Sequence, residues 1–274
     1  MIELPEGLHL ADQMDKQLKH KKIVSVVANA SPHGFACYEG DPAEYDAKFS
    51  GRTVEGAYSY GGKVHLAMSG EAEFFFADGI VFRYLEPDAK LPKKHQLCLE
   101  FEDGSHLTGS VRMYGNLQGY VGKYENGYDE IARLRPSPLS DDFTMEYFES
   151  LLKSSNKKKL SVKAFLASEQ RVPGLGNGVL QDILFDAGIQ PRRDMATVSD
   201  AELERMWKSV RSVLAVMTEQ HGRDVETDLY AKEGGYKTMM SKNTYAYPCP
   251  RCGGPITREA FMGGSVYYCA HCQR

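Results

Sequence analysis

The chain has 274 residues, of which 42% are hydrophobic, and a formal net charge of −4. This composition excludes a disordered or fibrous protein, and the length exceeds the usual size of a single domain. No basic start is followed by an apolar leader, and no run approaches the roughly 18 apolar residues of a membrane helix. We therefore expect a soluble cytoplasmic protein of two domains, or of one domain with appendages.

The charge is distributed unevenly along the chain. Residues 151–274 contain 18 Lys and Arg against 13 Asp and Glu, whereas residues 1–150 contain 15 against 24. A basic C-terminal half can bind a polyanion while the acidic half supplies chemistry. On charge alone, a chance imbalance among solvated side chains remains the alternative.

The N-terminal half is predicted to form one helix followed by a β-rich domain. Residues 19–22 are basic and suit the end of a helix. Residues 23–120 are rich in Val, Tyr, Phe and Thr and contain turn signals such as A-D-G and E-D-G, which predicts a sandwich or barrel of short strands. The apolar residues at helical spacing in the first segment are Leu10, Ala11, Met14 and Leu18.

The C-terminal half is predicted to be mostly helical. Proline and serine crowd the stretch P-S-P-L-S at 136–140, which predicts a linker. Ser199 and Glu202 form a predicted capping box at the start of the last helix. The predicted helices cover residues 143–153, 160–169, 178–187 and 200–219.

The last 26 residues contain a zinc-ribbon pattern. Two close cysteine pairs give the spacing C-x2-C-x16-C-x2-C, in which two turns present four thiolates to one tetrahedral ion. Four sulfurs close the site, so we expect one structural Zn²⁺ and no open position for catalysis. The expected ligands are Cys249, Cys252, Cys269 and Cys272.

A glycine-rich turn lies within Q-R-V-P-G-L-G-N-G-V-L-Q-D-I-L, which begins at residue 170. A helix is expected to start after Asn177 and to end at Gly188. Backbone N–H groups at such a helix start suit a phosphate, and Lys163 on the preceding helix is placed to reach the same anion. Asn177 then either caps the helix or holds the phosphate. Plain turn glycines and a helix cap are the alternative interpretation.

The chain opens with M-I-E-L-P-E-G, an acidic start with a proline at position 5. Together with the glycine-rich turn and the terminal ribbon, this M-x-E-L-P-E opening resembles the formamidopyrimidine-DNA glycosylase and endonuclease VIII family from end to end. The three separated motifs occur in the order found in that family, which chance does not readily produce.

The resemblance implies an α+β multidomain fold. An N-terminal helix with a β-sandwich is expected over residues 1–135. A DNA-binding domain with a helix-two-turns-helix motif follows over 136–240, and a zinc ribbon over 241–274. The implied partner is double-stranded DNA with a damaged base or an abasic site. The resemblance also implies a monomer of the bacterial cytosol and nucleoid that does not bind membranes.

The implied activity is that of a DNA glycosylase with abasic-site lyase activity in base-excision repair. In this family a damaged, oxidised base is flipped out, and the N-terminal amine attacks C1′ of the sugar and releases the base. The resulting Schiff base allows the strand to be cut. An amine suits this step because its ordinary pKa of about 7.7 to 8.0 leaves a neutral fraction near pH 7.

The resemblance assigns roles to three residues near the reacting sugar. Glu3 matches the catalytic acid of the family, Glu6 its second acidic position, and Lys63 the lysine of its G-K strand. By themselves, Glu6 is also a favourable residue for a helix N-terminus, and Lys63 is an ordinary lysine of a strand edge.

Other positions match DNA contacts of the family. Arg112 and Tyr114 in V-R-M-Y-G match an arginine and a phenylalanine that fill the gap opposite the lesion. Ile80 falls where the family has a methionine wedge, while Met68 in H-L-A-M-S-G is expected in the core. The phosphate contacts carry over to Asn177 and Lys163.

Two departures from the family pattern affect the expected chemistry. Ile2 stands where family members have proline or another small residue that becomes the first residue. Met1 therefore persists and carries the amine, or is removed to expose Ile2, or the amine chemistry is lost. In the ribbon, Gly264 replaces an arginine, so the phosphate grip is weakened or Arg258 supplies it.

These departures leave two other functions open. The first is a catalytically weak or inactive relative that binds damaged DNA. The second is a scaffold with a zinc ribbon that binds no nucleic acid, which we rank last.

Overall fold

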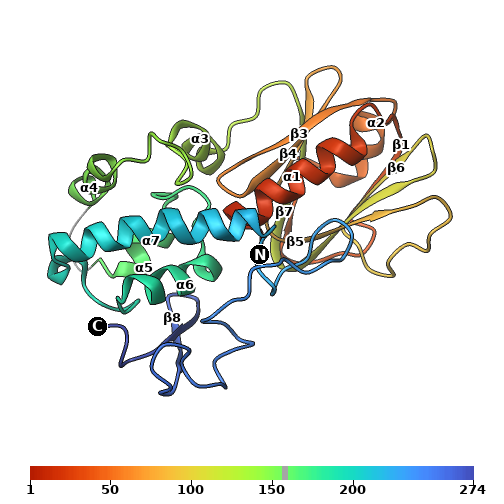
Figure 1. Ribbon diagram of the computed structural model, residues 1–274. Coiled ribbons are helices and arrows are strands. Elements are labelled where there is room, and N and C mark those ends of the chain that lie inside the picture. Colours follow the sequence, from red (N-terminus) through yellow and green to blue (C-terminus); the bar gives the residue numbers. More distant parts are fainter. Residues whose placement is uncertain (156–159) are drawn as a thin grey trace. The chain divides into compact units, whose positions relative to one another are not determined.

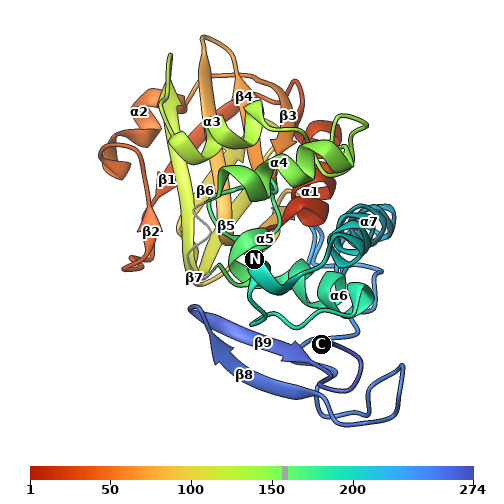
Figure 2. The same cartoon turned by 90° about the vertical axis from the view of Figure 1, so that its left-hand side faces the viewer.

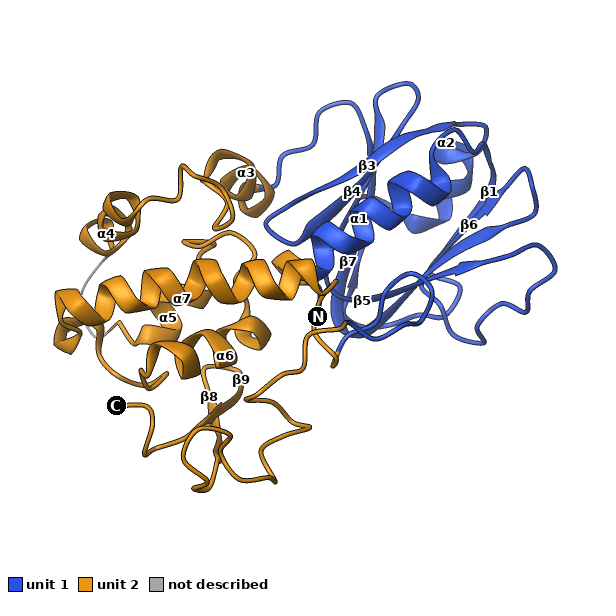
Figure 3. Ribbon diagram, in the orientation of Figure 1, with its two compact units in different colours: residues 1–2, 6–126, 226–234 blue, residues 3–5, 127–225, 235–274 orange. Residues whose placement is uncertain are grey.

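The computed structural model describes residues 1–155 and 160–274 (Figure 1). It contains two compact units, which Figure 3 shows in different colours. The first unit comprises residues 1–2, 6–126 and 226–234, and the second comprises residues 3–5, 127–225 and 235–274. The content of helices and sheet confirms the predicted α+β class, and the three predicted domain ranges stay predictions.

The first unit is built on a sheet with the strand order β1-β6-β7-β5-β4-β3, and β2 pairs with β7 outside this path (Figure 2). The pairs are antiparallel except β2 with β7. This arrangement confirms the predicted β-rich segment. The strands are β1 (Ile23–Ala28), β2 (Ala36–Cys37), β3 (Val54–Tyr60), β4 (Lys63–Met68), β5 (Ala72–Leu85), β6 (Leu97–Phe101) and β7 (His106–Val121). The helices are α1 (Leu4–Leu18), which belongs to this unit from Glu6 onward, and α2 (Tyr45–Phe49), which a 3-10 turn (Pro42–Glu44) precedes.

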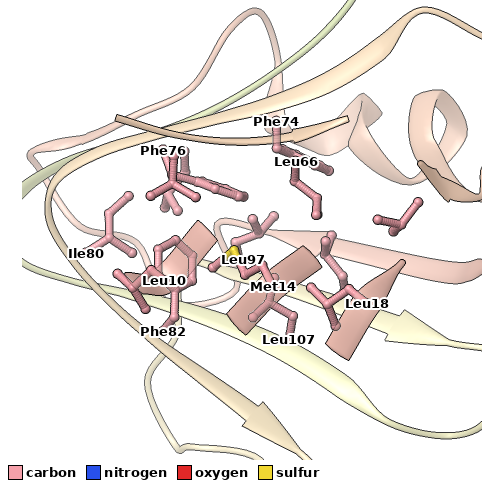
Figure 4. Close-up of a cluster of buried hydrophobic side chains, with 14 of the residues drawn as sticks. Leu10, Met14, Leu18, Leu66, Phe74, Phe76, Ile80, Phe82, Leu97 and Leu107 are labelled. Atoms are coloured by element: carbon pink, nitrogen blue, oxygen red, sulfur yellow. The ribbon is translucent and has the colours of Figure 1, made fainter. Parts of the chain in front are cut away.

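The predicted N-terminal helix is confirmed, and its apolar face forms the core with one face of the sheet (Figure 4). Leu10, Met14 and Leu18 follow each other at four-residue spacing, so they lie on one side of α1. Each is at most 4% exposed, and burying such a side chain contributes about 1.5 to 3 kcal/mol. Met68 is 1% exposed, as expected for a core residue.

A bulge interrupts the pairing of β5 with β7. Asp78 pairs with Gly115 and Ile80 pairs with Val111, so residues 112–114 face the single residue Gly79. Residues 112–114 are all exposed, whereas the flanking residues Val111 and Gly115 are buried. The extra residues therefore leave the plane of the sheet, as in other β-bulges.

The second unit contains five helices among its described residues and a two-stranded hairpin. They are α3 (Gly127–Leu134), α4 (Met145–Ser154), α5 (Val162–Ala167), α6 (Asn177–Ala187), α7 (Asp200–Glu219), β8 (Thr257–Phe261) and β9 (Gly264–Tyr268), with a 3-10 turn at Met195–Thr197. The four predicted helices are present, and the capping box is confirmed because Ser199 N donates to Glu202 at 2.9 Å. α3 is a short helix that precedes the predicted linker and is not among the predicted helices.

Phe185 of α6 packs in a small core with residues of the ribbon. Its partners in this core are Met240 and the ribbon residues Cys249, Ile256 and Cys269. Gly188 ends α6 in the left-handed conformation, as predicted, with a φ of 71°. None of the helices described here is both long enough and apolar enough to span a membrane.

Candidate functional site

The carboxylate of Glu3 caps the N-terminus of α6. Its Oε1 accepts a hydrogen bond from Gly178 N at 2.8 Å, and its Oε2 accepts one from Val179 N at 2.7 Å. The residue at the N-cap position is Gly176, which has no side chain to cap the helix itself. Because the N-terminus of a helix carries partial positive charge, it stabilises the negative charge of Glu3 and fixes the position of this carboxylate.

Arg223 adds a full positive charge to this carboxylate. Its Nη1 lies 3.7 Å from Glu3 Oε2, and the two side chains are only 2% and 3% exposed. A Cβ atom at position 176 would lie 2.7 Å from the Glu3 carboxyl, and one at position 178 would lie 1.6 Å from Arg223 Nη1. Glycines at these two positions are therefore required by the close approach of Glu3 and Arg223.

Arg223 is not among the site residues that the sequence predicts. The residue follows the long helix α7 in an H-G-R-D stretch, and nothing in this pattern indicates a partner at position 3. Only the arrangement of the second unit brings the two residues together.

The predicted phosphate cradle at the start of α6 requires a correction. The N–H groups of Gly178 and Val179 bind Glu3 in this structure, so they do not present a vacant anion site. Asn177 does not cap the helix, because it is the first helical residue and Gly176 is at the N-cap position. Asn177 Nδ2 instead donates to Ser265 O at 3.0 Å. The side chain thus contacts the ribbon hairpin, and its phosphate contact stays a prediction.

Lys163 contacts the same hairpin. Its Nζ donates to Phe261 O at 2.6 Å, and the residue is 4% exposed. Burial lowers the pKa of Lys163 below its ordinary value.

Gly264, at the position of the expected arginine, is close to Asn177, since a Cβ there would lie 3.2 Å from Asn177 Nδ2. Arg258 is exposed and stacks over the ring of Tyr245, 5.5 Å from its centroid.

The N-terminus is held in the first unit by two contacts. Ile2 N donates to Asp78 O at 2.8 Å, and the Ile2 side chain is 8% exposed within the core. The Met1 amine forms an ion pair with Glu226 Oε1 at 2.5 Å. The isoleucine is therefore a packing residue as well as a candidate nucleophile.

Lys63 and Glu6 are both buried, at 7% and 6% exposure. Burial raises the pKa of Asp78, while the positive charges of Lys63 and the N-terminus act in the opposite direction. Lys63 therefore belongs to the electrostatic surroundings of the N-terminus. Glu6 lies in the first turn of α1, where its charge suits the helix N-terminus.

Ile80 does not have the geometry expected of a wedge. It is 5% exposed and belongs to the hydrophobic core (Figure 4). The bulge opposite, by contrast, exposes Arg112 and Tyr114. Tyr114 Oη lies 3.8 Å from Met1 Sδ, which places the bulge beside the N-terminus within the first unit.

The four ribbon cysteines form a site that fits zinc. Their Sγ atoms all lie within 4.8 Å of one another. The distance from Cys249 to Cys272 is 3.9 Å and that from Cys252 to Cys269 is 3.5 Å. A Zn²⁺ ion bound by four thiolates at about 2.3 Å separates the sulfurs by about 3.8 Å. The protein therefore has a closed, structural site for one zinc ion, as predicted.

Two parts of the chain match known protein families. Residues 134–228 match the formamidopyrimidine-DNA glycosylase H2TH domain, and residues 248–274 match a zinc finger found in FPG and IleRS. The formamidopyrimidine-DNA glycosylase of Geobacillus kaustophilus is 30% identical over 251 residues, which cover 85% of this chain and 86% of the relative. That of Prochlorococcus marinus (strain NATL2A) is 34% identical over 223 residues, with coverages of 77% and 72%.

Solved structures have the same fold. MutM (Fpg) from Thermus thermophilus gives a TM-score of 0.80 at 24% identity, over 99% of this chain and 98% of that one. Lactococcus lactis Fpg in complex with abasic-site DNA gives a TM-score of 0.82 at 22% identity, over 99% of both chains. These features define the class of proteins that combine a helix-two-turns-helix domain with a zinc ribbon. The chain belongs to the formamidopyrimidine-DNA glycosylase family.

Proposed function

We propose that this protein is a DNA glycosylase with abasic-site lyase activity that removes damaged bases from duplex DNA in base-excision repair. The observation that carries this proposal is the fixed carboxylate of Glu3, directly after the first two residues of the chain. A buried carboxylate held by two backbone N–H groups and Arg223 is preorganised to stabilise positive charge beside a reacting amine. The names of the relatives agree with this reaction.

The reaction uses the N-terminal amine, which Met1 carries in the full-length chain and Ile2 carries after removal of Met1. This amine attacks C1′ of the damaged nucleotide. The bond from C1′ to the base breaks, and the base leaves with the bonding electrons and takes up the proton that the amine loses on attack. The sugar then opens to a Schiff base, and loss of a C2′ proton breaks the 3′ C–O bond. Glu3 stabilises the positive charge that develops on the sugar and on the Schiff base.

Glu6 and Lys63 are assigned to the catalytic site, where they act near the sugar and the DNA backbone. The other predicted site residues are assigned to DNA binding, with Arg112 and Tyr114 acting on the strand opposite the lesion. Asn177 and Lys163 would exchange the ribbon carbonyls of Ser265 and Phe261 for phosphate oxygens when DNA binds. We further propose that the protein acts as a monomer in the bacterial cytosol.

A second candidate function is recognition of damaged DNA without cleavage. The ion pair of the Met1 amine with Glu226 favours it, because a carboxylate of the protein itself holds the amine that the reaction needs. In this case the protein would bind abasic DNA in a salt-dependent manner and leave it intact.

Borohydride trapping on a duplex with one abasic site distinguishes the two functions. We expect a covalent product, and mass mapping of the peptide identifies Met1 or Ile2 as the residue that carries the amine. A crosslink at Lys63 would move the chemistry to that side chain. Salt-dependent binding without any crosslink, together with no excision of oxidised bases, would support the second candidate.

Glu3→Gln provides the variant that tests the role of the carboxylate. We expect duplex binding to persist while base release is lost. Base release at the wild-type rate would exclude Glu3 from the reaction. A circular dichroism spectrum and a zinc content equal to those of the wild type control for folding.

A further inference from the structure

The bulge of β7 presents three neighbouring side chains of different chemistry. Arg112 is exposed, Met113 is 64% exposed and Tyr114 is 42% exposed. Gly79 faces them from β5, and a Cβ there would lie 2.8 Å from Tyr114 O. The absence of a side chain at position 79 thus makes room for the bulge backbone.

The bulge is anchored at both ends. Val111 N donates to Gln96 Oε1 at 2.7 Å, and Gly115 N donates to Phe35 O at 3.0 Å. These bonds fix the strand on both sides of residues 112–114, so the three side chains project from a supported position.

We propose that Met113 is the apolar wedge that enters the base stack when a damaged base is extruded. This inference rests on the proposed glycosylase function. Met113 is a large apolar side chain that lies in the bulge between a cationic and an aromatic residue, both of which are suited to contact with bases. Its thioether is flexible and polarisable, which suits contact with stacked bases.

The location of Met113 supports the same role. Its neighbour Tyr114 contacts Met1, so the bulge lies beside the N-terminus that carries the reacting amine. Ile80, the wedge expected from the family pattern, is buried in the core. The apolar function has therefore moved from β5 to the bulge of β7, where an apolar residue stands between the matched arginine and aromatic residue.

Met113→Ala tests this proposal in two assays. Insertion of a wedge compensates for unstacking, which costs a few kcal/mol per base step. We therefore expect excision of an oxidised base from duplex DNA to slow by about tenfold or more. A preformed abasic site has no base to extrude, so its cleavage at saturating protein should change by less than about threefold.

Two further variants serve as controls. Met113→Leu retains apolar bulk and should restore excision. Val121→Ala truncates another exposed apolar side chain of β7, 48% exposed and outside the bulge, and should have no effect.

The fluorescence of a 2-aminopurine placed next to a stable abasic analogue gives an independent measure of insertion. The wild type should change this fluorescence, and Met113→Ala should not. Excision by Met113→Ala at the wild-type rate, or equal losses on both substrates, would overturn the wedge. Absence of both activities in the wild type would instead overturn the proposed function, while the fluorescence assay would still report on insertion.

Discussion

Arg223 and Glu3 form a buried ion pair although 220 positions separate them in the chain, with 3.7 Å between Nη1 and Oε2. The pair lies against the glycines that start α6, which leaves no room for a side chain at position 176 or 178. The glycine-rich turn, the acidic opening and the loop after α7 are therefore parts of one packing arrangement.

Removal of Arg223 should destabilise the protein. Arg223→Ala leaves a buried carboxylate without its ion-pair partner, a change that typically costs about 3 kcal/mol. We expect this loss in the free energy of unfolding of the second unit, measured by urea denaturation.

Arg205→Ala is the matched control for this loss. Its ion pair with Glu202 is long, at 3.8 Å, and Arg205 is 54% exposed, so this substitution should cost less than about 1 kcal/mol. Equal effects of the two substitutions would contradict a structural role for the pair of Glu3 and Arg223.

A single methyl group at position 178 should disrupt the same arrangement. In Gly178→Ala the new Cβ would lie 1.6 Å from Arg223 Nη1 and 2.9 Å from Glu3 Oε1. Such crowding costs about 1 to 3 kcal/mol, and displacement of Glu3 should also slow base excision. Thermal unfolding and excision assays test both effects. Gly127→Ala is the control, since a Cβ there meets no atom within 4 Å and the melting temperature should not fall.

Removal of zinc should unfold the ribbon and leave the sheet of the first unit intact. Cys269→Ser removes a zinc ligand, and a strong chelator removes the ion. Either treatment removes the free energy of zinc binding that stabilises the folded ribbon. We expect one zinc ion per wild-type chain in a colorimetric release assay, and weaker duplex binding after its loss.

Cys37→Ser changes an exposed cysteine outside the site and should retain both zinc and DNA binding. Wild-type affinity of the zinc-free protein for duplex DNA would show that the folded ribbon is not needed for DNA binding.

Acid should weaken the capping box of α7. Arg193 and Ser199 lower the pKa of Glu202 to about 2. A depressed carboxyl pKa contributes stability above the unfolded value of about 4.3, and this stability is lost as the pH falls toward 2. We expect the difference in unfolding free energy between the wild type and Glu202→Gln to be largest at pH 6 and to shrink by pH 3. A difference that stays constant over this range would contradict the assignment.

The local structure and the family membership of the chain are readable from its sequence. The four-residue spacing of Leu10, Met14 and Leu18 predicted α1, and the β-rich composition predicted the sheet. The two cysteine pairs predicted the zinc site, because metal ligation depends on short spacings that remain visible in a sequence. The same holds for the capping box, whose Ser199 and Glu202 are three residues apart.

The contacts between residues far apart in the chain depend on the tertiary structure. Glu3 binds the N–H groups of residues 178 and 179, and Arg223 completes the pair, so the predicted phosphate cradle holds a carboxylate of the protein itself. The bulge that exposes Met113 and the burial of Ile80 depend on the register of β5 with β7. Short spacings encode backbone geometry and metal ligation, whereas contacts between distant residues arise only when whole elements pack together.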